Sequence, residues 1–138
     1  MAKLLASLLF AFSSAALAQV ELLYIGAADC GFCRKWEAQY LQHGKPKATL
    51  DWAAVRFTPV DIGSFRAPFD ANSAPAHLRP GLAKALAAAG RTTLRGTPWF
   101  ALFIDGEVVA HGFGLGAFEH RIRPALKEAL REKASTRA

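Results

Sequence analysis

Cys30 and Cys33 are the only two cysteines in this chain of 138 residues, and Gly31 and Phe32 separate them. Thiol–disulfide exchange needs a reactive thiolate and a second sulfur that is close enough to resolve the mixed disulfide. The C-x-x-C spacing supplies both groups. A bridge between these residues closes a very short loop, so it constrains the unfolded chain little and is a poor structural crosslink. The pair therefore predicts redox chemistry.

The residues around the pair predict how the two sulfurs are held. Val20–Ile25 is an apolar run of strand length, and a helical pattern starts at Cys30 and is expected to end at Gly44 and Pro46. The first turn of a helix has unpaired N–H groups and the positive end of the helix dipole, which both favour a thiolate. We therefore expect Cys30 to be the nucleophile and Cys33 to be the more buried, resolving thiol.

The rest of the chain predicts one α/β domain built on a mixed sheet. Pro59 lacks an amide donor, which favours an edge strand or the end of a strand, and Pro124 either kinks the last helix or starts its second half. A strand–helix–strand unit followed by a hairpin gives parallel and antiparallel pairs, with helices on both faces of the sheet. Beyond the elements at the cysteines, we expect strands at 55–61, 99–104 and 107–111, a tight turn at Asp105-Gly106, a long loop at 64–80, and helices at 80–89 and from 117 onward.

Residues 1–18 have the composition of a secretory signal peptide. Lys3 gives a positive start, the apolar run after it is shorter than the ~20 residues of a membrane span, and Ala16-Leu17-Ala18 has the small-x-small form of a cleavage site. We expect cleavage after Ala18, with a retained membrane anchor as the alternative. The predicted division is a signal peptide at 1–18, one domain at 19–133 and a disordered tail at 134–138. Export implies a periplasmic or secreted protein, in a compartment where disulfides persist.

The formal net charge of +6 raises the question of an anionic partner such as nucleic acid. The positive residues are scattered or lie near the C-terminus, where Glu128 and Glu132 are interleaved with them. This pattern is typical of a solvated helix face, and no nucleic-acid motif accompanies it. We therefore expect no nucleic-acid partner.

Two cysteines three positions apart are also half of a zinc site. Structural zinc takes four ligands, and the four histidines form no H-x₃₋₅-H pair: His43, His77, His111 and His120. We therefore expect no metal centre, although two thiolates are able to hold Cu(I).

Gly96-Thr97-Pro98 stands immediately before the apolar run that begins at Trp99. Taken alone, Pro98 is explained as a proline that opens a strand through a trans bond, because only ~5–6% of X-Pro bonds are cis. Two further features stand in a consistent order: a strand before C-x-x-C, and Asp105-Gly106 followed by a short strand and a final helix. Together these features make the chain similar to thioredoxin-like proteins. The resemblance covers roughly Val20 to Leu130 and implies a thioredoxin-like fold.

The resemblance implies a substrate-binding surface around the cysteines. The Thr97–Pro98 bond is expected to be cis, to pack against the pair and to present the Thr97 backbone to client chains. Gly31 lets a partner chain approach closely, and Phe32 offers an apolar contact. Trp99 is assigned to the same surface, although burial in the core explains its position equally well.

Two positions depart from the thioredoxin pattern. Asp29 stands where thioredoxins usually carry Trp before the first cysteine, and a nearby carboxylate disfavours the Cys30 thiolate. A helix N-cap is the other explanation for Asp29. Tyr24 replaces the acid that thioredoxins bury six residues before the first cysteine. The proton acceptor for Cys33 would then be water, Glu21 or Tyr24.

These features predict a periplasmic thiol–disulfide oxidoreductase that acts on client proteins through the Cys30/Cys33 couple and uses no bound cofactor. No hydrogen-bond donor stands between the sulfurs, which together with Asp29 favours a reductant. A reductant in an oxidising compartment needs a membrane electron donor. No dimerisation segment precedes the module, so we expect a monomer. The alternative is a non-enzymatic module that binds a partner or Cu(I) through the same face.

Overall fold

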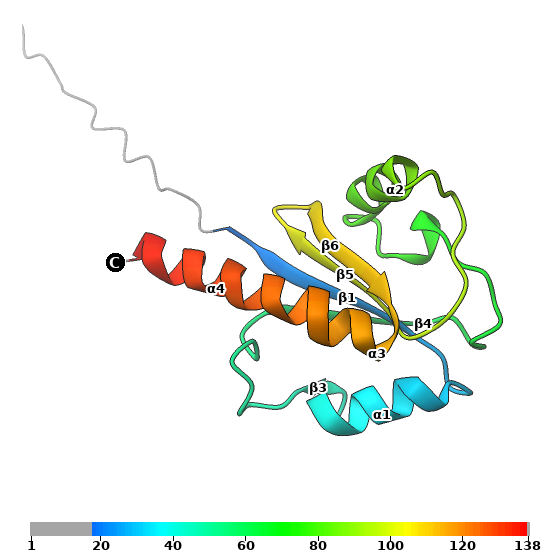
Figure 1. Ribbon diagram of the computed structural model, residues 1–138, viewed down its shortest axis with the longest axis horizontal. Coiled ribbons are helices and arrows are strands. Elements are labelled where there is room, and N and C mark those ends of the chain that lie inside the picture. The colour runs from blue at the N-terminus through cyan, green and yellow to red at the C-terminus, as the bar shows by residue number, and fades with distance from the viewer. Residues whose placement is uncertain (1–17, 138) are drawn as a thin grey trace, which may run out of the picture.

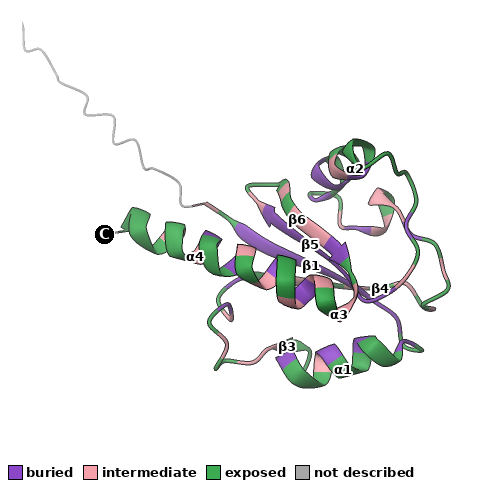
Figure 2. Ribbon diagram, in the orientation of Figure 1, coloured by how far each residue is buried: buried purple, intermediate pink, exposed green. Residues whose placement is uncertain are grey.

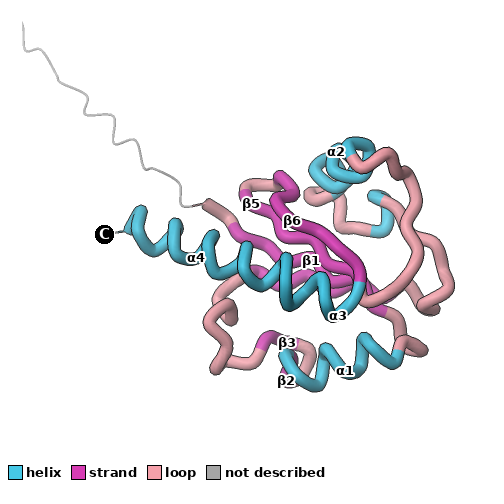
Figure 3. The backbone as a smooth tube through the Cα atoms, in the orientation of Figure 1, coloured by secondary structure: helices cyan, strands magenta, loops and turns pink. Residues whose placement is uncertain are grey.

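A four-stranded mixed sheet lies at the centre of the computed structural model, which describes residues 18–137 (Figure 3). Its strands run in the order β4-β1-β5-β6. β1 pairs in parallel with β4 and antiparallel with β5, and β5 pairs antiparallel with β6. The mixed sheet expected from the sequence is confirmed. The strand bounds are β1 Val20–Gly26, β4 Arg56–Asp61, β5 Trp99–Ile104 and β6 Glu107–Phe113.

Helices cover both faces of this sheet (Figure 1). α1 and α4 lie on one face and α2 lies on the other. The result is a mixed α/β fold, consistent with a thioredoxin-like arrangement. The helix bounds are α1 Gly31–Tyr40, a 3₁₀ turn Ala71–Ser73, α2 Arg79–Ala88, α3 Gly114–Ala117, a π-helical turn Phe118–Ile122 and α4 Arg123–Arg137.

Each face of the sheet has its own apolar core, because successive side chains of β1 point to opposite faces. Leu22 and Tyr24 belong to the core under α1 and α4, whereas Leu23 and Ile25 belong to the core under α2. Trp36 of α1 stacks on Tyr24 with the ring centres 4.6 Å apart. β1 is buried along its whole length, as expected for a strand covered on both faces (Figure 2).

α1 ends earlier than the sequence suggests. Gly44 was expected to end it, but the last helical residue is Tyr40. The next residues form a small hairpin, β2 Leu41–Gln42 and β3 Lys45–Pro46, whose turn has a positive φ at Gly44. A local pairing of two short strands thus takes the place of the last expected helical turn.

The last helix resolves the two explanations of Pro124. Residues 114–137 are helical without a break, and Pro124 follows directly on the π-helical turn Phe118–Ile122 as the second residue of α4, so it stands where the second part of the last helix starts. α4 continues to Arg137, beyond the boundary expected at residue 133.

The expected signal peptide, apart from Ala18, lies outside the described residues. Within residues 18–137, no helix combines the length and apolar character needed to cross a membrane.

Candidate active site

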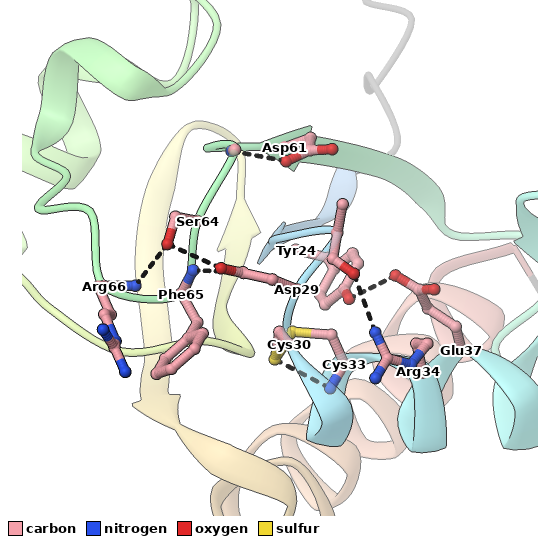
Figure 4. The surroundings of a disulfide bond; sticks show 12 residues. Tyr24, Asp29, Cys30, Cys33, Arg34, Glu37, Asp61, Ser64, Phe65 and Arg66 are labelled. Carbon is pink, nitrogen blue, oxygen red and sulfur yellow. Dashed lines mark hydrogen bonds between the residues drawn. A yellow bond between two sulfur atoms is a disulfide. The ribbon is translucent and has the colours of Figure 1, made fainter.

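The two cysteines lie at the start of α1: Cys30 ends the loop that follows β1, and Cys33 is in the first turn of the helix (Figure 4). They form a disulfide bond, and their Cα atoms are 5.2 Å apart. Cys30 is the N-cap residue of α1, and its Sγ accepts a hydrogen bond of 3.1 Å from the backbone N–H of Cys33. The same N–H would stabilise a Cys30 thiolate in the reduced protein. The pair thus lies where loop becomes helix, as predicted.

The two sulfurs differ in access to a partner. Cys30 is 3% exposed and lines an open groove, whereas Cys33 is 0% exposed and is not among the residues that line this groove. A molecule that enters the groove therefore meets Cys30 and not Cys33. The geometry favours the order predicted from the sequence, with Cys30 as nucleophile and Cys33 as resolving thiol.

The groove at Cys30 has a volume of about 550 Å³ and an aromatic rim. Phe32 of α1 is 59% exposed, Phe65 in the loop after β4 is 41% exposed, and Phe113 at the end of β6 is 58% exposed. Sequence analysis predicted Phe32 but missed Phe65 and Phe113. The residues that line the groove are Asp29, Cys30, Gly31, Phe32, Lys35, Phe65, Gly96, Thr97 and Phe113.

The segment before β5 forms another side of the groove. The Thr97–Pro98 bond is cis, the isomer that the resemblance implies. Thr97 lines the groove but is only 5% exposed, and within the described residues its buried hydroxyl has no hydrogen-bond partner. Pro98 is buried. A molecule bound in the groove would meet Thr97 and also Gly31, which is exposed on α1.

Trp99 does not lie on this surface. It is 3% exposed and packs in the core under α2, with its ring 5.8 Å from the ring of Phe69 and 5.7 Å from that of His111. Of the two explanations of Trp99, burial in the core is correct, and the assignment to substrate binding is wrong. The alternation of side chains along β5 turns Trp99 toward the face opposite to α1.

Asp29 fixes the neighbouring loop and is not the N-cap of α1. Its carboxylate accepts hydrogen bonds from the backbone N–H of Phe65 at 2.7 Å and from the hydroxyl of Ser64 at 2.8 Å (Figure 4). These two bonds, the first above all, lower the pKa of the Asp29 carboxyl. Asp29 is therefore negatively charged at neutral pH and stands directly beside Cys30.

Tyr24 lies under α1 and donates a hydrogen bond to Glu37 Oε1 at 2.7 Å (Figure 4). Burial, then this bond to the carboxylate, raises the pKa of the Tyr24 hydroxyl, so Tyr24 stays protonated and cannot be the proton acceptor at neutral pH. Glu37 follows Cys33 by four residues, the spacing that puts side chains on one helix face. Sequence analysis missed Glu37, although its spacing was visible.

Glu21 is excluded as the proton acceptor for Cys33. Its side chain points away from α1, as those of Leu23 and Ile25 do, and it is bound on the other face of the sheet. It accepts hydrogen bonds from Thr58 Oγ1 at 2.6 Å and lies 3.0 Å from His77 Nε2. This buried carboxylate ties the segment before α2 to the sheet and takes no part in the groove.

No group of three or more histidine, cysteine or acidic side chains in residues 18–137 is arranged to hold a metal ion.

Comparison with known proteins gives no further guidance, because no protein-family profile, no curated protein and no solved structure matches the chain. The fold and the site therefore define the molecule only as a mixed α/β protein with a disulfide at C-x-x-C spacing.

Proposed function

We propose that this chain is a periplasmic thiol–disulfide oxidoreductase of the thioredoxin-like class that reduces disulfides in client proteins. One observation carries the proposal: the two sulfurs at the start of α1 are unequally accessible. Cys30 lines an apolar groove and caps the helix, while Cys33 is enclosed behind it. A nucleophile and a resolving thiol need this difference in access.

The reaction follows from the positions of the two sulfurs. The Cys30 thiolate attacks one sulfur of a client disulfide, forms a Cys30–client disulfide and releases the other client sulfur as a thiolate. Cys33, as a thiolate, then attacks Cys30 Sγ, which closes the bridge in Figure 4 and releases the second client thiolate. The exchange transfers two electrons to the client. The two client thiolates are then protonated by water or by the proton that Cys33 released.

Residues near the sulfurs support the reducing direction. A strong oxidant stabilises its thiolate, and the negative charge of Asp29 beside Cys30 opposes that. The oxidised couple must then be reduced again, and in the periplasm we assign this to a membrane electron donor. The signal peptide expected at 1–18 supports export, and we propose that the exported chain acts as a monomer without a bound cofactor.

The test is reduction of a protein disulfide by the reduced chain that starts at Gln19, followed by electrophoresis without reductant. Cys33→Ser should accumulate a covalent complex with the client that dithiothreitol releases, because the resolving step is blocked. Cys30→Ser should form no such complex and lose the activity. A Cys30→Ser variant as active as the unchanged protein would refute the proposal.

The alternative is a module that binds a partner or Cu(I) through the same face without catalysing exchange. Two thiolates one helical turn apart are suitable ligands for Cu(I). Titration of the reduced protein with Cu(I) separates the two functions. Stoichiometric copper binding without reduction of protein disulfides would favour the binding module.

A further inference from the structure

We infer that the clients of this site present their reactive cysteine next to an aromatic or large aliphatic residue and an acidic residue. This inference rests on the proposed exchange function. It adds a substrate class, which the shape and the charge of the groove at Cys30 define.

The apolar half of the inference comes from the three exposed rings. Phe32, Phe65 and Phe113 belong to three different elements, yet all line the same groove with Cys30. Large apolar side chains gathered at one exposed place are typical of a binding site. A client side chain that enters between these rings loses its contact with water, so an aromatic or large aliphatic residue binds best.

The loop that carries Phe65 is held in place before a client arrives. The Asp29 carboxylate accepts hydrogen bonds from the Phe65 backbone N–H and from the Ser64 hydroxyl, so the loop after β4 is fastened to the residue before Cys30 (Figure 4). Asp29 is a positioning residue here, because it acts through the loop. A preformed surface has less conformational freedom to lose on binding.

The ring of Phe113 is held in place by two other contacts. The backbone N–H of Gly114 donates a hydrogen bond of 2.8 Å to the carbonyl oxygen of Pro98, which fastens the end of β6 to the segment beside the cysteines. The ring also lies against Gly96, where a Cβ atom would come within 2.8 Å of it. A side chain at position 96 would push Phe113 out of the groove.

The acidic half of the inference comes from the cations beside the rings. Lys35 Nζ lies 5.3 Å from the ring centre of Phe32, and the Arg66 guanidinium lies 5.3 Å from that of Phe65. Of these two cations Lys35 lines the groove, and Arg66 lies behind Phe65, where Arg95 donates a hydrogen bond of 3.3 Å to the Arg66 carbonyl oxygen. Asp29 is the one acidic side chain among the described residues that line the groove. An acidic client residue therefore complements the rim and speeds encounter.

The test uses four short peptides with one cysteine each, flanked by Phe or Ala on one side and by Glu or Lys on the other. Each cysteine is joined to thionitrobenzoate, a low-pKa leaving group. The Cys30 thiolate of the reduced, otherwise unchanged protein attacks the peptide sulfur and releases coloured thionitrobenzoate. Rates with dithiothreitol correct for the intrinsic reactivity of each peptide.

The Phe/Glu peptide should react about tenfold faster than the Ala/Lys peptide after this correction, a factor that corresponds to partial burial of one aromatic ring plus charge attraction. Phe113→Ala should reduce the preference for Phe, and Lys35→Gln with Arg66→Gln should reduce the preference for Glu. The matched controls are Val109→Ala, an exposed residue on β6 that does not line the groove, and Lys127→Gln on α4.

Three outcomes would overturn the inference. Equal corrected rates for the four peptides, in a protein that still reduces a small disulfide, would refute the client class and leave the exchange function standing. A preference for Lys would refute the assigned charge. Failure to react with any peptide or with the small disulfide would refute the inference together with the proposed function.

Discussion

Asp29 acts on its surroundings in two ways. It fastens the loop that carries Phe65, and as the residue directly before Cys30 it brings a negative charge to the same groove. Hydrogen bonds lower the pKa of its carboxyl in the folded protein, so both effects are fully present above the ordinary carboxyl pKa. They are lost as the pH falls through the lowered value. At neutral pH the Asp29 carboxyl is therefore ionised, and we expect its charge to disfavour a Cys30 thiolate.

Replacing Asp29 by Asn should increase the thiolate fraction of Cys30 in the reduced protein and move the reduction potential to a less negative value. The reason is that the substitution removes a negative charge near a forming one, an effect of up to about one pH unit on the thiolate titration. The ultraviolet absorbance of the thiolate, recorded against pH, measures the thiolate fraction of Cys30. Asp61→Asn, an exposed carboxylate that does not line the groove, is the control. An unchanged titration in Asp29→Asn would contradict the role assigned to this charge.

Tyr24 contributes a hydrogen bond from the core to the surface of α1. Tyr24→Phe keeps the stacked ring but removes the donor to Glu37, so the free energy of unfolding should fall by about 1 kcal/mol. Denaturant unfolding measures the change. Glu37→Gln, which keeps an acceptor oxygen, should cost less. A larger loss in Glu37→Gln than in Tyr24→Phe would argue against this bond.

Single residues show where sequence reasoning reached its limit. Cys30 and Cys33 were predicted because local spacing alone determines that one caps a helix and the other follows a turn later. The burial of Trp99 was one of two open explanations, because it depends on Phe69 and His111 approaching from other elements. The bond from Phe65 to Asp29 joins residues 36 positions apart, and no local pattern signals it.

At the scale of elements, α2 approaches the turn between β5 and β6 very closely. Gly81, in the first turn of α2, is buried, and a Cβ atom there would overlap the carbonyl oxygen of Gly106. Alanine normally favours a helix over glycine by about 1 kcal/mol. Contact with a backbone atom that cannot move aside should reverse the sign of this effect at Gly81.

Gly81→Ala should therefore lower the free energy of unfolding by about 2 kcal/mol, as overpacking in a core does. Thermal or denaturant unfolding of the oxidised protein measures this loss. Gly116→Ala in α3 is the matched control, because no atom lies within 4 Å of a Cβ built there. It should leave stability unchanged or raise it slightly. Equal effects of the two substitutions would contradict the close approach of α2 to the turn.

Most elements follow from the sequence, and their ends follow less well. β5 and β6 flank the Asp105-Gly106 turn, as the alternating pattern there predicts. β4 is an edge strand, in agreement with Pro59. The end of α1 does not, because β2 and β3 pair after Tyr40. Nor does the π-helical turn before α4. Both depend on packing between neighbouring segments and not on local preference.

At the scale of the molecule, His111 makes stability depend on pH. Partial burial, and then the charge of Arg121, lowers the pKa of His111 in the folded protein below its ordinary value of 6.5. The unfolded chain therefore binds a proton more readily. The contribution of His111 to the free energy of unfolding is fully present above pH 6.5. It is lost as the pH falls from 6.5 toward the pKa that His111 has in the folded protein.

The melting temperature should fall on acidification from about pH 7.5 to about pH 5.5, and His111→Gln should make that fall smaller. Calorimetry of the oxidised protein at several pH values measures it. His120→Gln, which replaces an exposed imidazole, is the matched control for the loss of a histidine side chain. A His111→Gln variant with an undiminished fall would show that other groups cause the pH dependence.

The whole groove could not be predicted from the sequence, although the dithiol at its base could. Phe32 was expected because it stands between the cysteines. Phe65 and Phe113 come from a loop and from the end of an edge strand, and only the packing of the sheet brings them to Cys30. The mixed sheet itself was predictable, since each strand and turn has its own local signal.

The reduction potential of the Cys30–Cys33 couple, measured in dithiothreitol or glutathione buffers on the chain that starts at Gln19, tests the central claim most directly. A reductant with no side-chain donor between its sulfurs and with a carboxylate on the residue before Cys30 should have a potential near the thioredoxin value of about −270 mV. A potential near the value of about −120 mV that is typical of a strong oxidant would contradict the account and would make the protein a donor of disulfides.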